Sequence, residues 1–560
     1  MKKRKKKKLS FTKIYTLFFT LITIIFIVFL KIVNIVPTAY FIIILLITFA
    51  LFLLVILMLK KKRKIGYILS ILIIIIYSVI TYYLGITMNF FSSLTSIHYT
   101  EKNYLVIVLN NEKYNNIKDL NNKSIADINK IDVTLDKALD KLNKKVQIKN
   151  IEYSDYNTLF TDLESERIES IFIEEAYYNI KKEEESTENY KIIDTIKIRS
   201  LTSNNLTKSV DITKDPFTIY ISGIDTYGSI ETVSRSDVNI LMTINPITKQ
   251  VLLTSIPRDY YVQLSGTTGY KDKLTHAGNY GIDMSINTIE ELLDIDINYY
   301  IRVNFSTLEK IIDALDGVDV YSRYSFVSYI DNYMFYEGYN HMNGKQALAF
   351  SRERKSLPNG DIDRGKNQQA VIEAIIRKIT SKDIIYKYTK ILNSLRGTFQ
   401  TNISDDDITK MVKKELENIG GWTITSISLE GTSEYNYTYS YNGQKLYVLV
   451  PDQDSINETV DLIKSVINGN KLEKSYDDNP SNIKNPNKVE IEIPKEEENN
   501  EDIEEEDTND DISNNENENN SDPLEDLLPE DNNENAENDN TDTEEEIDSN
   551  IQDLLPNSDT

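Results

Sequence analysis

Three long apolar segments open the chain, and shorter mixed patterns follow them. The apolar segments run from Ile14 to Val33, from Pro37 to Leu59 and from Ile65 to Thr87. Each reaches the roughly 20 residues that a helix needs to cross a bilayer. The first is too long for a cleaved signal peptide, and no small-residue cleavage site follows it. We therefore predict three transmembrane helices within residues 14–87.

Basic residues orient these predicted helices. The tip, residues 1–13, begins MKKRKKKK, and the loop between the second and third apolar segments reads KKKRK at residues 60–64. The first loop, near residues 31–37, is nearly uncharged. Basic loops stay on the cytoplasmic side of a membrane. We therefore expect a multi-pass cell-membrane protein whose N-terminus is cytoplasmic and whose chain after about Asn89 is extracellular.

Residues 98–205 are expected to form a small extracellular α/β accessory domain. YLVIVL predicts a strand, IKDLNNKSIADIN a helix-turn-strand unit, and ESIFIEEAYYNI a strand that leads into a helix. A charged linker at residues 181–190 should interrupt this domain. No set of ligand-binding residues is visible, so a packing role is favoured over ligand binding.

The main domain is expected at residues 211–470, where strand and helix patterns alternate. Strands are predicted in PFTIYISGID, in two apolar runs joined near Pro246 and ended at Arg258 and Asp259, and in YYIRVNF, VDVYS, AFSRER, WTITSISLEG and KLYVLVP. Helices are predicted at residues 284–293, 306–315, 382–395, 405–417 and 455–466 and in DRGKNQQAVIEAIIRKI. Several neighbouring strands look antiparallel. We predict an α/β fold with a mixed β-sheet sandwiched between helices.

Charge and composition narrow the class of protein. The net charge of the 560 residues is −25, but the charge is segregated between the basic tip and an acidic segment, residues 472–560, which is too polar to fold. The basic tip is too short for a nucleic-acid-binding domain. Cysteine is absent and the three histidines are scattered, which excludes disulfides, thiolate metal sites and an HExxH zinc site. The sequence also lacks GxSxG, GxGxxG and Walker A motifs.

Three arginines and a glutamine gather between residues 350 and 372. If AFSRER ends a strand, Arg352 and Arg354 share one face of it. A turn at LPNGD and a helix opened by Asp361 or Asp363 would then place Arg364 and Gln368 on one helical face. Helix N-termini favour anions rather than arginines. The pattern therefore suggests a phosphate cradle, although a surface salt-bridge network is the more ordinary interpretation of such a run.

Acidic and basic residues at strand ends supply a second half of this candidate site. Asp225 ends one predicted strand, Arg235 and Asp237 open the next, and Arg258 ends its partner. Asp225 and Asp237 are candidate ligands of Mg²⁺ or Mn²⁺, since such ions are often held by one or two carboxylates and substrate phosphates. The alternative is that each aspartate only neutralises an arginine.

These residues lie within motifs that resemble a known family. In order, the motifs are GIDTYG, VSRSDVNILMTINP, LLTSIPRDYYV, DKLTHAGNYG, YYIRVNF, LDGVDV, ALAFSRER and DRGKNQQAVIEAI, between residues 216 and 393. They resemble the LytR-CpsA-Psr family of Gram-positive envelope enzymes, and the three spans and accessory domain resemble its capsule-associated branch. The resemblance implies Mg²⁺-dependent transfer of a glycopolymer from a polyprenyl-pyrophosphate carrier to peptidoglycan, with the lipid in an apolar pocket.

The resemblance also implies residue roles. Asp225 and Asp237 would be metal-associated and, with Arg258, catalytic. The residues expected to bind pyrophosphate are Arg235, Arg258, Arg352, Arg354, Arg364 and Gln368. The general base is not identified, because a metal-bound carboxylate is a poor base. Val371, Ile372 and Ile375 are candidates for the wall of the lipid pocket, although core packing is favoured for most of them.

The expected function is that of a membrane-anchored phosphotransferase acting on a capsular polysaccharide or a polymer of the teichoic-acid type. Its expected partners are the lipid-linked glycan, peptidoglycan, membrane lipid and the machinery that makes capsule or wall polymers, without nucleic acid. Two alternatives remain. The first is a phosphatase or pyrophosphatase that acts on the same lipid carrier, which would need the same phosphate cradle. The second is a non-enzymatic sensor of the cell envelope, which would need no catalytic residues. The small cytoplasmic face weighs against signalling by this chain alone.

Overall fold

The computed structural model describes residues 11–61, 63–94, 99–128, 133–201, 208–224, 230–381, 391, 394, 398–441 and 443–472. Several predictions lie outside these residues. They concern most of the basic tip, Asp225, nearly all of the helix expected at 382–395, and the acidic segment beyond residue 472.

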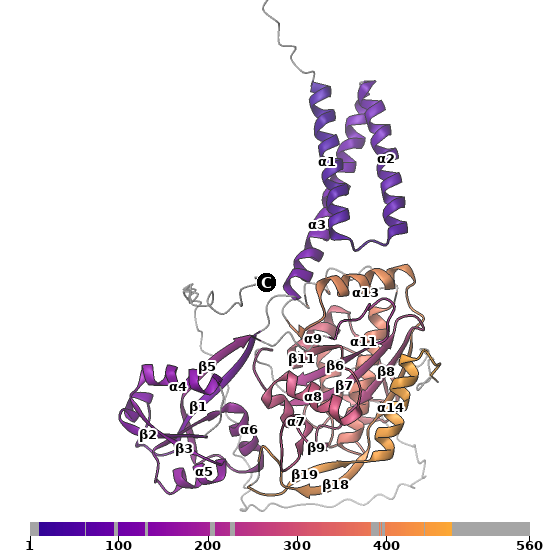
Figure 1. Ribbon diagram of the computed structural model, residues 1–560. Helices are drawn as coiled ribbons and strands as arrows, with labels where there is room; N and C mark the ends of the chain where they lie inside the picture. The colour runs from indigo at the N-terminus through magenta and orange to yellow at the C-terminus, as the bar shows by residue number, and fades with distance from the viewer. Residues whose placement is uncertain are drawn as a thin grey trace, which may run out of the picture. The chain divides into compact units, whose positions relative to one another are not determined.

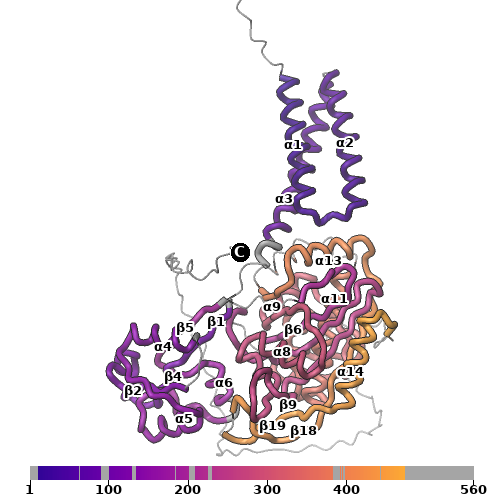
Figure 2. Tube along the Cα trace, in the orientation of Figure 1, coloured from indigo at the N-terminus to yellow at the C-terminus, as the bar shows by residue number. Residues whose placement is uncertain are grey.

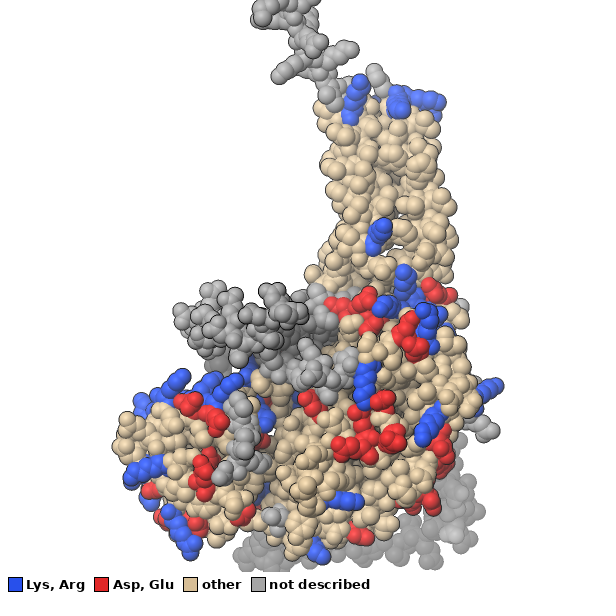
Figure 3. Space-filling view, in the orientation of Figure 1, with Lys and Arg blue, Asp and Glu red and all other residues tan. Residues whose placement is uncertain are grey.

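Three long apolar helices form the N-terminal part, as predicted. They are α1 (Phe11–Val33), α2 (Thr38–Lys60) and α3 (Lys64–Leu94), and each is long and apolar enough to cross a membrane. Their surface is largely uncharged except at one end, where lysine and arginine gather (Figure 3). The rings of Phe26 and Tyr77 stack at 4.1 Å between α1 and α3. The orientation of these helices in the membrane stays a prediction.

The accessory part contains a five-stranded sheet in the order β3-β2-β4-β1-β5. Its elements are β1 (Tyr99–Leu109), η1 (Ile117–Leu120), β2 (Lys123–Ile128), α4 (Val133–Lys145), β3 (Ile148–Tyr153), α5 (Tyr156–Glu164), β4 (Ser170–Glu174), α6 (Glu175–Glu184) and β5 (Tyr190–Leu201). The α/β prediction is confirmed. The linker predicted at 181–190 is wrong in its first half, because α6 continues to Glu184. Lys181 stays helical with its ammonium 4.6 Å from the Phe160 ring centre.

The main sheet has six strands in the order β16-β11-β6-β7-β8-β17. These are β16 (Gln400–Thr401), β11 (Tyr299–Asn304), β6 (Phe217–Ile224), β7 (Ser236–Asn245), β8 (Gln250–Ser255) and β17 (Thr423–Ser428). β11 pairs parallel with β6 and β8 parallel with β17, whereas the other pairs are antiparallel. The predicted mixed sheet is confirmed. β6 and β8 are buried along their whole length, polar residues such as Thr218 and Thr254 included, because helices cover both faces of the sheet.

Helices cover both faces of this sheet (Figures 1 and 2). On one face, Tyr220, Leu241 and Leu252 pack with α8 (Ile282–Leu293) and α14 (Gln453–Ile467). On the other, Ile219 and Leu253 pack with α11 (Asp361–Ile379) and α13 (Asp405–Glu417). The sandwich predicted from the sequence is therefore present. Alternate side chains along each strand pack against the helices on opposite faces of the sheet.

A smaller layer beside α11 is built from α9, α10 and short strands. Its elements are α9 (Phe305–Ala314), β12 (Val318–Ser322), β13 (Phe326–Val327), β14 (Met334–Phe335), β15 (Gly338–Met342) and α10 (Gly344–Arg352). The strand predicted in AFSRER is wrong, because these residues end α10. Asn343 and Gln346 form a capping box at its start, each accepting the other's backbone N–H at 3.0 Å, and this nucleates a helix.

Two further differences concern the strands near the site. β8 ends at Ser255, so Arg258 and Asp259 lie in the following loop rather than on the strand. The hairpin of β18 (Gly431–Asn436) and β19 (Leu446–Pro451) contains one strand, β18, that the sequence did not predict. Four of the six residues of β18 are exposed, which removes the apolar alternation that identifies a strand.

Candidate active site

A cavity of about 510 Å³ lies between the main sheet and the layer of α9, α10 and α11. Most of its wall is apolar. The apolar lining comes from Ile221, Val238, Met242, Ile301, Val303, Phe305, Leu308, Ile311, Ile330, Leu348, Val371, Ile372, Ile375, Ile376 and Ile379. The three α11 positions for which core packing was favoured, Val371, Ile372 and Ile375, thus also wall this cavity.

The polar part of the cavity wall brings six of the eight predicted site residues together. They are Asp237, Arg258, Arg352, Arg354, Arg364 and Gln368. Asp225 lies outside the described residues, but Gly223 and Ile224 just before it line the cavity. Arg235 is not in the lining. It still belongs to the site electrostatically, since its guanidinium lowers the pKa of Asp237.

Asp237, the second residue of β7, is held by two neighbours. Its Oδ2 lies 3.1 Å from Nη1 of Arg258, and its Oδ1 accepts a hydrogen bond from Thr275 Oγ1 at 2.9 Å. Burial alone would raise the pKa of this carboxyl group. The guanidiniums of Arg258, Arg235 and Arg364 outweigh burial, so the pKa lies below its usual value. Asp237 is therefore an ionised carboxylate at neutral pH.

Arg258 lies between two carboxylates in the loop after β8. Besides Asp237, it faces Asp259, whose Oδ2 lies 3.5 Å from the Arg258 Nε. The backbone N–H of Thr275 donates to the Arg258 carbonyl at 2.9 Å, which ties this loop to α7 (Leu274–Ala277). A fixed backbone on both sides holds the guanidinium at the cavity wall.

Arg364 lies in the first turn of α11, as the sequence predicted. Its Nη2 is 2.5 Å from Oδ1 of Asp361, the residue that opens the helix. Burial raises the pKa of Asp361 and lowers that of Arg364, although each opposes the other's shift. The turn sits directly on the end of β8, because a Cβ added to Gly365 would lie 2.9 Å from Ser255 Oγ.

Arg352 and Arg354 differ from the other arginines, because neither is within 4 Å of a carboxylate oxygen among the residues that the structure describes. Arg352 lies over the Phe305 ring at 4.4 Å from its centre, and Arg354 is exposed. The neighbouring Glu353 is already engaged by backbone groups: Oε1 accepts the N–H groups of Arg354 and Ser356, both at 2.9 Å. The salt-bridge alternative therefore holds for Arg258 and Arg364 but not for this pair.

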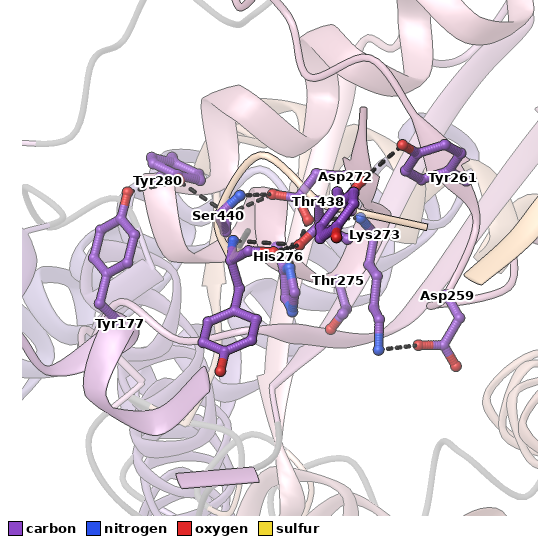
Figure 4. A network of polar contacts seen from close by, with 12 residues as sticks. Tyr177, Asp259, Tyr261, Asp272, Lys273, Thr275, His276, Tyr280, Thr438 and Ser440 are labelled. Carbon is purple, nitrogen blue, oxygen red and sulfur yellow. Dashed lines mark hydrogen bonds and ion pairs between the residues drawn. The ribbon is translucent and has the colours of Figure 1, made fainter. Parts of the chain in front are cut away.

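Sequence reasoning missed the residues that support the site from β10 (Asp272–Lys273) and α7. Asp272 is fully buried and lies 2.6 Å from Nδ1 of His276, while its other oxygen accepts the Ser440 N–H at 2.8 Å (Figure 4). Lys273 Nζ reaches Asp259 at 3.5 Å in the same network. The motif DKLTHA contains Asp272, Lys273, Thr275 and His276, so its dense polar pattern was the available signal.

The backbone of Arg235 is packed against the turn that follows α7. A Cβ added to Gly278 would lie 2.7 Å from the Ser234 carbonyl oxygen and from the Ser236 nitrogen. Real Cβ atoms do not approach backbone this closely, so glycine is required there. This contact fixes the start of β7 and with it the position of Asp237.

The described carboxylates at this site are too few to bind a metal ion by themselves. They fit an ion whose remaining ligands are phosphate oxygens of the substrate. Within the described part of the chain, no group of three His, Asp or Glu side chains could hold a metal ion. Asp237 is ionised, the state that binds cations, and Mg²⁺ is commonly held by one or two carboxylates with phosphate oxygens completing its shell. The second predicted ligand, Asp225, lies outside the described residues.

Comparisons with known proteins identify the family of this chain. The model of the family described as LytR_cpsA_psr matches residues 176–461. "Polyisoprenyl-teichoic acid--peptidoglycan teichoic acid transferase TagU" of Enterococcus faecalis is 35% identical over 268 residues, or 47% of this chain and 83% of that protein. The protein of the same name from Bacillus licheniformis is 33% identical over 46% of this chain and 81% of its own length. The crystal structure of B. subtilis TagV matches with 30% identity and a TM-score of 0.40, over 46% of this chain and 98% of that chain.

Proposed function

The chain belongs to the LytR-CpsA-Psr family, and we propose that it is a membrane-anchored phosphotransferase that attaches a lipid-linked glycopolymer to peptidoglycan. The observation that carries the proposal is one cavity with an apolar wall and four arginines. An isoprenoid tail and a pyrophosphate group require this combination. The polymer would be of the teichoic-acid type, as in the names of the TagU relatives, or a capsular polysaccharide.

The apolar wall supports binding of the carrier's hydrocarbon chain. Side chains of α11 from Val371 to Ile379 line one side, and residues of β7, β11 and α9 line the other. Hydrocarbon that enters such a cavity leaves water, which stabilises the complex by roughly 25 cal/mol per Å² of buried apolar surface. The carrier would therefore lie with its chain along α11 and its phosphates at the helix N-terminus, where anions are favoured.

The four arginines would bind the pyrophosphate in two different ways. Arg352 and Arg354 form no ion pair with a described carboxylate, so they can bind phosphate oxygens directly, and a guanidinium does so bidentately. Arg258 and Arg364 are already paired with Asp237 and Asp361. These ion pairs fix the two guanidiniums before the ligand arrives, so that their charge faces the leaving phosphate without reorganisation.

The residues also fit a divalent cation, and we propose Mg²⁺ or Mn²⁺. Asp237 would hold it, together with Asp225. When bound, such an ion would withdraw charge from the phosphate oxygens as a Lewis acid.

In the proposed reaction, a sugar hydroxyl of peptidoglycan forms a bond to the phosphorus that carries the glycopolymer. The bond from this phosphorus to the polyprenyl phosphate breaks, which leaves a phosphodiester on the wall. Asp237 is a poor candidate for the base that takes the hydroxyl proton, because the surrounding guanidiniums lower its pKa. Its contribution is to orient Arg258 and to attract positive charge.

A transfer assay with the full-length protein tests the proposal. Lipid-linked glycan and peptidoglycan would be supplied with and without Mg²⁺, and both products would be measured. The proposal expects polymer attached to peptidoglycan and polyprenyl phosphate released in equal amounts. Release of the phosphate product without attachment would instead show a hydrolase of the same carrier.

A further inference from the structure

A row of exposed tyrosines lies on the β18–β19 hairpin and beside it. It consists of Tyr270, Tyr435, Tyr437, Tyr439 and Tyr447, called here the tyrosine row, with 38–66% of each side chain exposed. β18 and β19 lie next to β9 (Tyr261–Val262), at the end of the main domain away from α13 (Figure 1). A cluster of large aromatic side chains on a protein surface often marks a binding site, whereas single exposed ones are ordinary.

Ring contacts join four of the five tyrosines in two pairs. Tyr435, Tyr437 and Tyr439 are exposed and alternate with the less exposed Asn436 and Thr438 along the end of β18 and the bend that follows it. Tyr447 lies directly opposite Tyr435 on the neighbouring strand, with ring centres 6.0 Å apart and planes at 76°. The Tyr270 ring centre lies 5.7 Å from that of Tyr437. The row therefore contains two ring pairs and the exposed ring of Tyr439.

Buried polar contacts hold the backbone under the row. The N–H groups of Tyr439 and Ser440 donate to the Lys271 carbonyl at 3.0 Å and to Asp272 Oδ2 at 2.8 Å. The Tyr261 hydroxyl donates to the Tyr437 carbonyl at 2.8 Å (Figure 4). The rings are thus presented on a fixed backbone while their faces stay in water. Such preorganised aromatics bind a partner with little loss of conformational entropy.

The same contacts connect the row to the active site. Asp272 precedes Thr275 by three residues, and Thr275 donates to Asp237. The N–H of Leu449, two residues after Tyr447, donates to the carbonyl of Asp259 at 2.8 Å. The hairpin and the loop that carries Arg258 are therefore parts of one hydrogen-bonded unit. A polymer bound on the row would be held by the structure that positions the catalytic groups.

We propose that the tyrosine row binds the sugar backbone of the acceptor polysaccharide, an inference that rests on the proposed function. Pyranose rings offer flat C–H faces that stack on aromatic rings and hydroxyl edges that pair with phenol groups. Between residues 431 and 451 the only charged residues are Glu434 and Lys445. With Lys271 beside Tyr270, the surface of five tyrosines carries few charges and suits a sugar chain, whereas the arginine-lined cavity suits the anionic carrier. The two substrates thereby have separate and chemically different sites.

Binding of chitohexaose and of glycan strands stripped of their stem peptides tests the row. Both probes would be titrated against the full-length protein in lipid nanodiscs. The double variant Tyr435→Ala/Tyr447→Ala should weaken binding about tenfold or more, as loss of central aromatic contacts does. Tyr435→Phe/Tyr447→Phe, which keeps the rings, should stay within about threefold of the wild type.

The chain offers a closely matched control. Tyr321 and Tyr339 are also directly opposite on a two-stranded sheet, with ring planes at 76° and centres 5.4 Å apart, but they lie on β12 and β15 outside the cavity lining. Alanine at both positions should leave glycan binding unchanged. Equal weakening by this control, normal binding by the Tyr435/Tyr447 alanine variant, or binding that requires stem peptides would each overturn the inference.

The same preparations separate this inference from the proposed function. The wild-type protein would also be assayed for transfer, and each variant for binding of a polyprenyl-pyrophosphate analogue. The alanine pair should reduce glycan binding while carrier binding is unchanged. Transfer by the wild type with tyrosine-independent glycan binding would overturn only the role of the row. Tyrosine-dependent glycan binding without any transfer would overturn only the phosphotransferase.

Discussion

Thr275 and Arg258 hold opposite oxygens of the same carboxylate. Thr275 Oγ1 donates to Asp237 Oδ1 at 2.9 Å, and Arg258 Nη1 lies 3.1 Å from Oδ2. Asp237 therefore cannot rotate without breaking one contact. Its orientation is set by a threonine on α7 and an arginine on the loop after β8, two segments joined by their own backbone hydrogen bond.

Thr275→Val should slow transfer while leaving the fold intact. Valine matches threonine in shape but donates no hydrogen bond, and a hydrogen bond to a charged group contributes about 1.5–3 kcal/mol. If that energy orients Asp237 in the transition state, the rate should fall about 10- to 100-fold. Initial rates and melting temperature would be measured together.

Thr459→Val is the matched control for this change. Thr459 is fully buried on α14, and its hydroxyl has no hydrogen-bond partner within the described structure. Its replacement should alter neither rate nor melting temperature by much. A normal rate in Thr275→Val would show that Asp237 is oriented without this hydrogen bond.

Alanine at both Arg352 and Arg354 should abolish release of polyprenyl phosphate without unfolding the protein. Neither guanidinium is paired with a described carboxylate, so their removal leaves no buried charge uncompensated. Carrier binding and product release would be measured beside circular dichroism spectra. Arg167→Ala removes an exposed arginine from the accessory part and serves as the charge control. Wild-type activity in the double variant would exclude these arginines from the cradle.

Asp237→Asn should weaken the response of transfer to Mg²⁺. The amide keeps the size of the side chain and removes its negative charge, so a cation loses one ionised ligand. We expect the half-saturating Mg²⁺ concentration to rise roughly tenfold, equivalent to about 1.4 kcal/mol. Asp461→Asn, an exposed position on α14, is the control. An unchanged titration with a reduced maximal rate would leave Asp237 as an arginine partner only.

Asp127 in the accessory part should make stability depend on pH. Burial raises its pKa to about 6, although a hydrogen bond from Asn150 opposes the shift. The folded state thus binds this proton more tightly than the unfolded chain. Ionised Asp127 lowers the free energy of unfolding by its full amount above about pH 6. This destabilisation disappears as the pH falls toward the pKa of the unfolded chain, near 4.

Asp127→Asn should therefore stabilise the accessory part at pH 7 and not at pH 4. At about 1.4 kcal/mol per pKa unit, the gain is at most about 3 kcal/mol. Hydrogen exchange of β2 amides at the two pH values would measure it. Asp140→Asn, on the neighbouring helix α4, is an exposed control. A gain of equal size at both pH values would exclude the titration of Asp127 as its cause.

The extent to which the site could be predicted differs between its parts. α11 was predicted because Arg364 and Gln368 repeat at helical spacing and aspartates occupy the first turn before them. α10 was misassigned, since Ala349 to Arg354 is too short a window for a strand to be distinguished from the end of a helix. The capping box at Asn343 and Gln346, six residues upstream, held the decisive signal.

Other site residues depend on tertiary contacts that no local pattern expresses. Thr275 reaches Asp237 only because α7 packs on the start of β7, with Gly278 against the backbone there. Asp361 looked like a helix opener and is also the buried partner of Arg364. The tyrosine row was not predicted either, because β18 exposes most of its residues and lacks an apolar face.

Under the proposed function, the length of α11 would set how much of the carrier chain the cavity covers. Arg364 and Gln368 lie near its start and Ile379 at its last turn, and all three line the cavity. The distance from Arg364 to Ile379 is about 22 Å at 1.5 Å per residue. If the proposed function holds, a carrier chain longer than this would project beyond the helix, and its far end could stay in the bilayer while its phosphates react. The protein would then act on a substrate that is still anchored in the membrane, without extracting the whole lipid.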